Sequence, residues 1–200
     1  MNRMIRLHRQ RQERGSVAIE AALVIPLLML VLFGIVEFSM LLRDHVSLTA
    51  AARSGARIGS AEPRMSTFSN DMAAAVARAG TGMPASTIQE LWVYEANVKG
   101  YPTNGGSPSG TTTSFTACTL RCKKFTYSGG SFTPAGGTWD ATDVNACPGD
   151  TGMTSVGVYI RANHRFISGL FGSSVQITDH AVMRFEPIPA SALTQGATCK

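Results

Sequence analysis

The sequence predicts an α+β fold, in which a long N-terminal transmembrane helix continues into a small extracytoplasmic domain with an antiparallel sheet. Two observations carry this prediction. Residues 21–42 form an apolar run with a single charged side chain, Glu37. Two later segments, 156–162 and 175–185, alternate apolar and polar residues as half-buried strands do. An antiparallel sheet packed on the second half of the helix would bury the apolar faces of both.

The apolar run is long enough to cross a bilayer. Its 22 residues, at about 1.5 Å rise per residue, cover about 33 Å, and the hydrocarbon core of a bilayer is about 30 Å thick. A buried helix of a soluble protein rarely stays apolar on every face for this length. A cleavable secretory signal is also disfavoured, because its apolar core is shorter and ends at a small-x-small site that is not clear here.

The charge distribution sets the expected orientation. Residues 1–15 hold five arginines and one glutamate, so this short segment carries +4 of the chain's net +5. A basic flank keeps its side of a membrane helix in the cytoplasm, whereas a nucleic-acid binder would carry a basic stripe on its folded domain. We therefore expect the membrane, and no nucleic acid, as a partner. The predicted parts are a basic cytoplasmic leader (1–15), a transmembrane helix (16–42), an extracytoplasmic helix extension (43–62) and an α+β domain with Gly/Ser/Thr-rich loops (63–200).

The cysteines fit an oxidising compartment. All four lie beyond the apolar run, and an even count in a polar domain favours disulfides. The spacing does not choose among the possible pairings. The irregular gaps match a zinc site poorly, so we expect no metal and no cofactor. The disulfide candidates are Cys118, Cys122, Cys147 and Cys199.

The junction between leader and helix holds a carboxylate that needs a partner. The leader ends at Gly15, Ser16 follows, and Glu20 lies inside the start of the helix. An ionised group at the edge of the hydrocarbon is costly unless it is paired. Cleavage after Gly15 would give Ser16 an α-ammonium group, which would pair with Glu20 one helical turn away or with the Glu20 of a neighbouring chain. Alternatively, Glu20 reaches the cytoplasmic headgroups close to Arg14.

Five short motifs follow one another along the N-terminal part of the chain: Arg14-Gly15, the segment 16–20, Pro26, GIVEF at 34–38 and AARSGAR at 51–57. In their order and spacing, these motifs resemble the TadE/TadG-like pseudopilins of the Tad (Flp) type IV pilus system. The resemblance implies a type IV pilin-like fold and processing by a prepilin peptidase at Gly15, Ser16 and Glu20. The ending ITDHAVMRFEP at 177–187 also resembles the last strand of such proteins.

Five positions of the helix are expected to matter for packing. Pro26 lacks a backbone donor and Gly34 lacks a side chain, so both soften the apolar part. Ala51, Gly55 and Gly59 follow at intervals of four and form a small-residue face that lets another helix or a sheet approach closely.

Glu37 requires its own explanation. It lies 17 residues beyond Glu20, about 25 Å along a helix axis, which places it near the outer interface of the membrane. It is expected to reach toward water or, in a bolder interpretation, to pair between subunits.

The remaining domain shows short elements separated by loops. A helix is expected at 69–79, and strands at 91–98 and 125–127, the first with Trp92, Tyr94, Ala96 and Val98 on one face. The segments 156–162 and 175–185 are expected to pair as a hairpin. Glycine, proline, serine and threonine dominate the expected loops at 100–116, 129–137 and 148–152.

No set of residues has a catalytic pattern, so an enzyme is not expected. The resemblance implies a minor pseudopilin or assembly factor acting in pilus biogenesis, adhesion or secretion, with the prepilin peptidase, other pilins or pseudopilins and the pilus assembly platform as partners. It places the chain in the cytoplasmic (inner) membrane as a single-pass protein with a cytoplasmic N-terminus and a periplasmic domain, or in the pilus. The alternative function is a membrane-anchored extracytoplasmic binding module whose helix is a passive tether.

Overall fold

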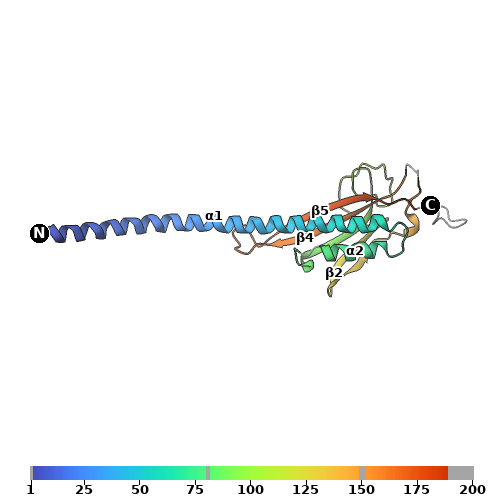
Figure 1. Ribbon diagram of the computed structural model, residues 1–200. Helices are drawn as coiled ribbons and strands as arrows, with labels where there is room; N and C mark the ends of the chain where they lie inside the picture. The colour runs from blue at the N-terminus through green and yellow to red at the C-terminus, as the bar shows by residue number, and fades with distance from the viewer. Residues whose placement is uncertain (1, 80–81, 149–151, 189–200) are drawn as a thin grey trace.

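The computed structural model describes residues 2–79, 82–148 and 152–188. Its main element is the helix α1 (Asn2–Ala61). The domain packs against the C-terminal part of this helix, and the N-terminal part protrudes far beyond the domain (Figure 1). The helix continues through Pro26 without interruption. Among the described residues, α1 is the one helix long and apolar enough to cross a membrane, and its apolar stretch is exposed on all sides.

The domain combines α1 and a second helix with one sheet. The sheet has five strands in the order β3-β2-β1-β4-β5, and every neighbouring pair is antiparallel. The predicted α+β fold is therefore confirmed. The elements that follow α1 are α2 (Phe68–Ala79), β1 (Ile88–Ala96), β2 (Cys122–Ser128), β3 (Ser131–Gly136), β4 (Ser155–Arg165) and β5 (Ser174–Arg184), with short 3-10 turns at Ala85–Thr87 and Ala141–Asp143.

The hairpin of β4 and β5 forms as the alternating pattern predicts. Val158 lies opposite Ala181, and His164 lies opposite Val175 near the turn. The apolar residues of one β4 face, among them Val156 and Ile160, are fully buried. Figure 1 shows the hairpin extending along α1 toward its N-terminal end, beyond the rest of the sheet.

Strand β3 corrects one sequence prediction. The segment 129–137 was expected as a loop because it is rich in glycine, and that expectation is wrong over Ser131–Gly136. Gly129 and Gly130 both have positive φ and form a tight two-residue turn, which is the geometry that a Gly-Gly pair favours in hairpins. β3 is an edge strand with mostly exposed side chains, so its backbone pairing leaves little apolar pattern in the sequence.

The main core lies between the sheet and the two helices. It includes Phe68 and Met72 of α2, Leu48 of α1 and the inner faces of β1 and β4. The opposite face of the sheet is covered by the segment 97–121, whose Phe115 stacks on Tyr159 with ring centroids 4.1 Å apart. The expected loop at 100–116 therefore contributes an aromatic side chain to a second, smaller apolar cluster.

Small residues let α2 and β4 approach α1 closely. A Cβ atom on Gly55 would lie 2.6 Å from Cγ2 of Val76 and 3.3 Å from the backbone oxygen of Met72. On Gly59 it would lie 2.2 Å from the sulfur of Met72, whose side chain is flexible enough to move aside. Of these two glycines of α1, Gly55 is therefore the one at which a side chain is less tolerable.

We predict that Gly55→Ala destabilises the domain by about 1–3 kcal/mol, because overpacking exceeds the gain of up to about 1 kcal/mol in helix propensity. Gly34→Ala is the matched control, since its Cβ would meet Phe171 at an ordinary 3.8 Å. Thermal unfolding of the full chain in detergent, followed by circular dichroism, measures both. Equal midpoints for the two variants would contradict the close approach at Gly55.

Candidate functional site

The proposed processing residues lie on the free part of α1. Gly15, Ser16 and Glu20 are all exposed, and a Cβ on Gly15 would meet nothing within 4 Å. Glu20 has no partner among the residues whose side chains the structure describes. The large apolar side chains from Val17 to Val36 are exposed as well. This part of the helix thus presents a carboxylate and an apolar surface to whatever surrounds it.

The packing positions fall into two groups along α1. Ala51, Gly55 and Gly59 belong to the stripe that faces α2 and the sheet, and Ala51 is fully buried. Gly34 faces the ring of Phe171 in the β4–β5 turn, although it lies within the predicted membrane segment. Pro26 lies within the helix, among the exposed residues.

The most unusual contact of α1 is made by Glu37. Although it belongs to the apolar run, only 2% of this residue is exposed. The backbone N–H of Ser168, in the turn between β4 and β5, donates a hydrogen bond to Oε1 of Glu37. Glu37 is therefore satisfied within its own chain, at least at one oxygen, whereas Oε2 is buried without a hydrogen bond. The sequence alone predicts water or another subunit as the partner of Glu37, whereas the observed donor belongs to the same chain.

Two further polar contacts connect the hairpin to α1. Nδ1 of His164 lies 2.6 Å from Oδ2 of Asp44, and because an ionised carboxylate only accepts, this nitrogen carries the proton. The hydroxyl of Thr49 donates to Oδ2 of Asp179. With Glu37, these contacts follow one face of α1 over about 18 Å at the standard helical rise. They hold the hairpin lengthwise against the helix.

A groove remains between α1 and the turn of the hairpin. Its volume is about 480 Å³. Apart from Glu37 and Ser168, its lining consists of apolar side chains: Phe33, Val36, Ile167 and Leu170. The groove opens beside the predicted membrane segment, and its mostly apolar lining suits an apolar occupant.

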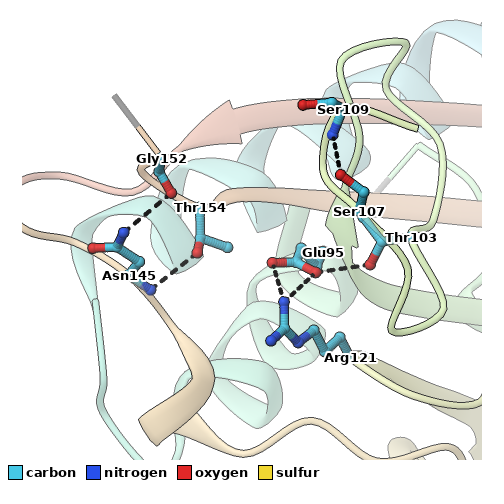
Figure 2. Close-up of polar contacts among 8 residues, drawn as sticks. All are labelled: Glu95, Thr103, Ser107, Ser109, Arg121, Asn145, Gly152 and Thr154. Atoms are coloured by element: carbon cyan, nitrogen blue, oxygen red, sulfur yellow. Dashed lines mark hydrogen bonds and ion pairs between the residues drawn. The ribbon is translucent and has the colours of Figure 1, made fainter. Parts of the chain in front are cut away.

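A second, polar cavity lies at the other end of the sheet. Figure 2 shows the polar contacts of several residues that line it. The cavity has a volume of about 450 Å³, and Glu95, Arg121 and Thr154 are among its lining residues. Nη1 of Arg121 lies 3.1 Å from both carboxylate oxygens of Glu95, which also accepts a hydrogen bond from the hydroxyl of Thr103 at 2.7 Å. Because Glu95 already neutralises Arg121 and Asp143 adds a further carboxylate, the described lining of the cavity offers no excess positive charge to an anionic ligand.

A disulfide restrains the segment that reaches this cavity. Cys118 and Cys122 are bonded to each other across four positions of sequence. Arg121 lies between them and has a positive φ of 49°. Cys147 is half-buried and forms no disulfide with the other described cysteines, and Cys199 lies outside the described residues. Over the described part of the chain, no group of three or more His, Cys, Asp or Glu residues could hold a metal ion.

Burial shapes the titration of two tyrosines on the outer face of the sheet. It raises the pKa of Tyr94 well above its ordinary value, and the hydroxyl donates to the carbonyl of Gly100 at 2.8 Å. Burial also raises the pKa of Tyr159, the partner of Phe115. Both phenols therefore stay neutral at physiological pH.

The hydrogen bond to Glu37 leads to a testable prediction. Glu37→Leu removes the acceptor of the Ser168 N–H, so amide hydrogen exchange in residues 166–173 should rise by about tenfold or more, as expected for losing a bond worth about 1.5–3 kcal/mol. Glu37→Gln keeps an acceptor oxygen and should show a smaller rise. Exchange of the full chain in lipid nanodiscs, read by mass spectrometry, measures both. Identical exchange in all three proteins would exclude this bond.

The buried carboxylate of Glu95 leads to a second testable prediction. Arg121→Met keeps most of the apolar stem but leaves Glu95 without its cation, and should cost about 2 kcal/mol of stability, less than for a fully buried pair because Arg121 is partly exposed. Adding Glu95→Gln should recover part of this loss. Arg53→Met, at an exposed position of α1, is the control and should change little. Chemical unfolding in detergent measures the free energy of unfolding of each variant. If Arg121→Met lowers it no more than Arg53→Met does, the ion pair between Arg121 and Glu95 does not stabilise the domain.

Comparison with known proteins bears on the helix rather than on the domain. The family model described as TadE-like protein matches residues 15–57. Comparisons with curated proteins and with solved structures gave no significant match. The matched segment begins at Gly15 and ends at Arg57, so it contains the predicted processing junction, the apolar run and the AARSGAR segment. Residues 15–57 are thus similar to TadE-like proteins, in agreement with the resemblance seen in the sequence.

Proposed function

We propose that this chain is a minor pseudopilin or assembly factor of a Tad/Flp-type pilus, processed by a prepilin peptidase after Gly15. The observation that carries the proposal is the state of Glu20. It is a carboxylate without a described partner on a helix whose apolar side chains are exposed on every face, inside the segment that matches the TadE-like family. A charge in that position needs a counter-charge from outside the described contacts.

Cleavage supplies such a counter-charge. Hydrolysis of the Gly15–Ser16 bond leaves an α-ammonium group on Ser16, one helical turn from Glu20 in the same chain. In an assembly of parallel helices, the Glu20 of one subunit neutralises the ammonium group of the next, which fixes the axial register between them. The exposed apolar surface from Val17 to Val36 then packs against neighbouring helices instead of lipid.

The proposal includes a topology. The arginines of the leader stay in the cytoplasm, α1 crosses the inner membrane once, and the domain is periplasmic. The disulfide between Cys118 and Cys122 supports this placement, because disulfides persist in oxidising compartments. The proposal gives the domain no catalytic role. Its partners are the prepilin peptidase, other pilins or pseudopilins, and the assembly platform.

The alternative is an anchored binding module, and the polar cavity beside Glu95 is the observation that favours it. In that case α1 is a passive tether, and Glu20 needs no partner in another chain. The pilin function requires particular side chains in residues 15–33. Binding in the cavity does not, because the cavity is at the far end of the domain.

We predict that the mature protein from its native host begins at Ser16. Glu20→Ala should leave cleavage intact but lower pilus assembly by about tenfold or more, the equivalent of at least about 1.4 kcal/mol per contact. Glu20→Asp keeps the charge and should retain part of the activity, and Val17→Ala is a neutral control on the same exposed surface. Intact-mass spectrometry and a quantitative pilus assay give the two readouts.

Two results would overturn the proposal. One is an intact Met1 in pilus-competent cells. The other is normal assembly when Glu20→Ala is combined with replacement of residues 21–32 by an unrelated apolar helix, which would favour the binding module.

A further inference from the structure

The turn of the β4–β5 hairpin, residues 166–173, has an apolar surface, which a loop in water does not normally have. We call it the hairpin tip. Ile167, Leu170 and Phe171 are 72%, 51% and 59% exposed. Turns between strands are usually built from polar residues, and a cluster of exposed large apolar side chains marks an interaction site. The tip therefore needs an apolar partner.

The position of the tip identifies the kind of partner. Phe171 faces Gly34, and Ile167 and Leu170 line the groove with Phe33 and Val36 of α1. These helix positions belong to the apolar run whose side chains are exposed all round. The apolar surface of the tip is thus continuous with the surface of α1 that faces the membrane interior, at the same level along the helix axis.

The polar groups around the tip fix its depth. Backbone N–H groups are costly in hydrocarbon unless they are paired, and the carboxylate of Glu37 accepts the N–H of Ser168. Arg43 and Arg165, both exposed, flank the contact between Asp44 and His164. Arg43 lies about 9–13 Å above residues 34–37 along the helix. This separation is close to the depth of about 5–10 Å at which apolar faces sit below the headgroups.

We propose that the hairpin tip is embedded in the outer leaflet of the membrane, with lipid acyl chains in the groove between the tip and α1. The domain is then held at two places, by α1 and by the tip, and the arginines meet the lipid headgroups. The outer boundary of the hydrocarbon falls near Glu37 instead of Leu42. This inference rests on the membrane placement of α1 but not on cleavage after Gly15 or on pilus assembly.

Tryptophan fluorescence in lipid nanodiscs tests the proposal on the full chain. Leu170→Trp and Ile167→Trp place a reporter on the tip, and either one suffices if the other fails to fold. Bromine on the acyl chains quenches tryptophan in lipid, and iodide quenches tryptophan in water. Emission of the wild type, from the buried Trp92 and Trp139, is subtracted as the baseline.

Two matched variants calibrate the signal. Leu30→Trp reports from the exposed apolar part of α1. Val98→Trp reports from a side chain that is 71% exposed just beyond β1, whose end Ala96 pairs with Ser155 at the opposite end of β4 from the tip. The tip reporters should lose emission to brominated lipid as Leu30→Trp does and resist iodide, whereas Val98→Trp should do the reverse.

Three results would overturn the inference, and they are distinguishable. Tip reporters that behave like Val98→Trp would place the tip in water while α1 remains in the membrane. Tip reporters shielded from both quenchers would place the tip against protein, such as a second copy of the chain. A Leu30→Trp that bromine does not quench would remove the membrane placement of α1 as well, and with it the topology on which the proposed function relies.

Discussion

The structure depends on one helix that meets two environments in succession. From Gly15 to Val36 the side chains of α1 are exposed on nearly every face, and from Glu37 onward one face is buried against the domain. The buried positions begin at Glu37 and then form adjacent pairs that repeat every four residues from Ser47 to Ser60, which keeps them on one side of the helix. They are Glu37, Ser47, Leu48, Ala51, Ala52, Gly55, Ala56, Gly59 and Ser60. Because most of these side chains are small, the sheet and α2 lie close to the helix backbone, and the domain cannot form its core without α1.

The sequence predicts the parts of this arrangement that leave a periodic pattern. The length and apolarity of residues 21–42 predict the helix, and strict alternation predicts β4 and β5 together with their pairing. The TadE-like match lies in the same N-terminal region, where motif order is readable without the fold. The spacing of Gly55 and Gly59 predicts a close approach, although it does not say which element approaches.

Other features have no local pattern from which they could be predicted. Glu37 and Ser168 are 131 positions apart, and nothing near either residue indicates the other. Phe115 lies in a stretch of threonine and serine that has too few apolar residues to suggest a core, yet its single ring covers Tyr159. β3 is stabilised mainly by backbone hydrogen bonds at a sheet edge, and only the Gly-Gly turn before it carried a usable signal.

The two carboxylates of the apolar segment have opposite requirements. Glu37 is buried, and Ser168 gives it a donor within the chain, so no second molecule is needed at that oxygen. Glu20 has no such donor among the described side chains, and it lies far from the domain along the same helix. The same residue type thus serves the internal fold at one end of the apolar run and remains available for an external partner at the other. A fold that paired both carboxylates within the chain would leave no charged group on this part of the helix to specify a neighbouring chain.

The passive-tether hypothesis is constrained by this division of α1. A helix that only anchors the domain could be exchanged from end to end, but here the residues from Gly34 onward contact the hairpin and the core. An exchange that includes them would unfold the domain and would say nothing about function. Only residues up to Leu32 can be replaced without touching a described packing contact of the domain, because Phe33 lines the groove beside the hairpin. The functional question is therefore confined to the segment that contains Gly15, Ser16 and Glu20, where the fold imposes no requirement of its own and a required side chain must have a partner outside the domain.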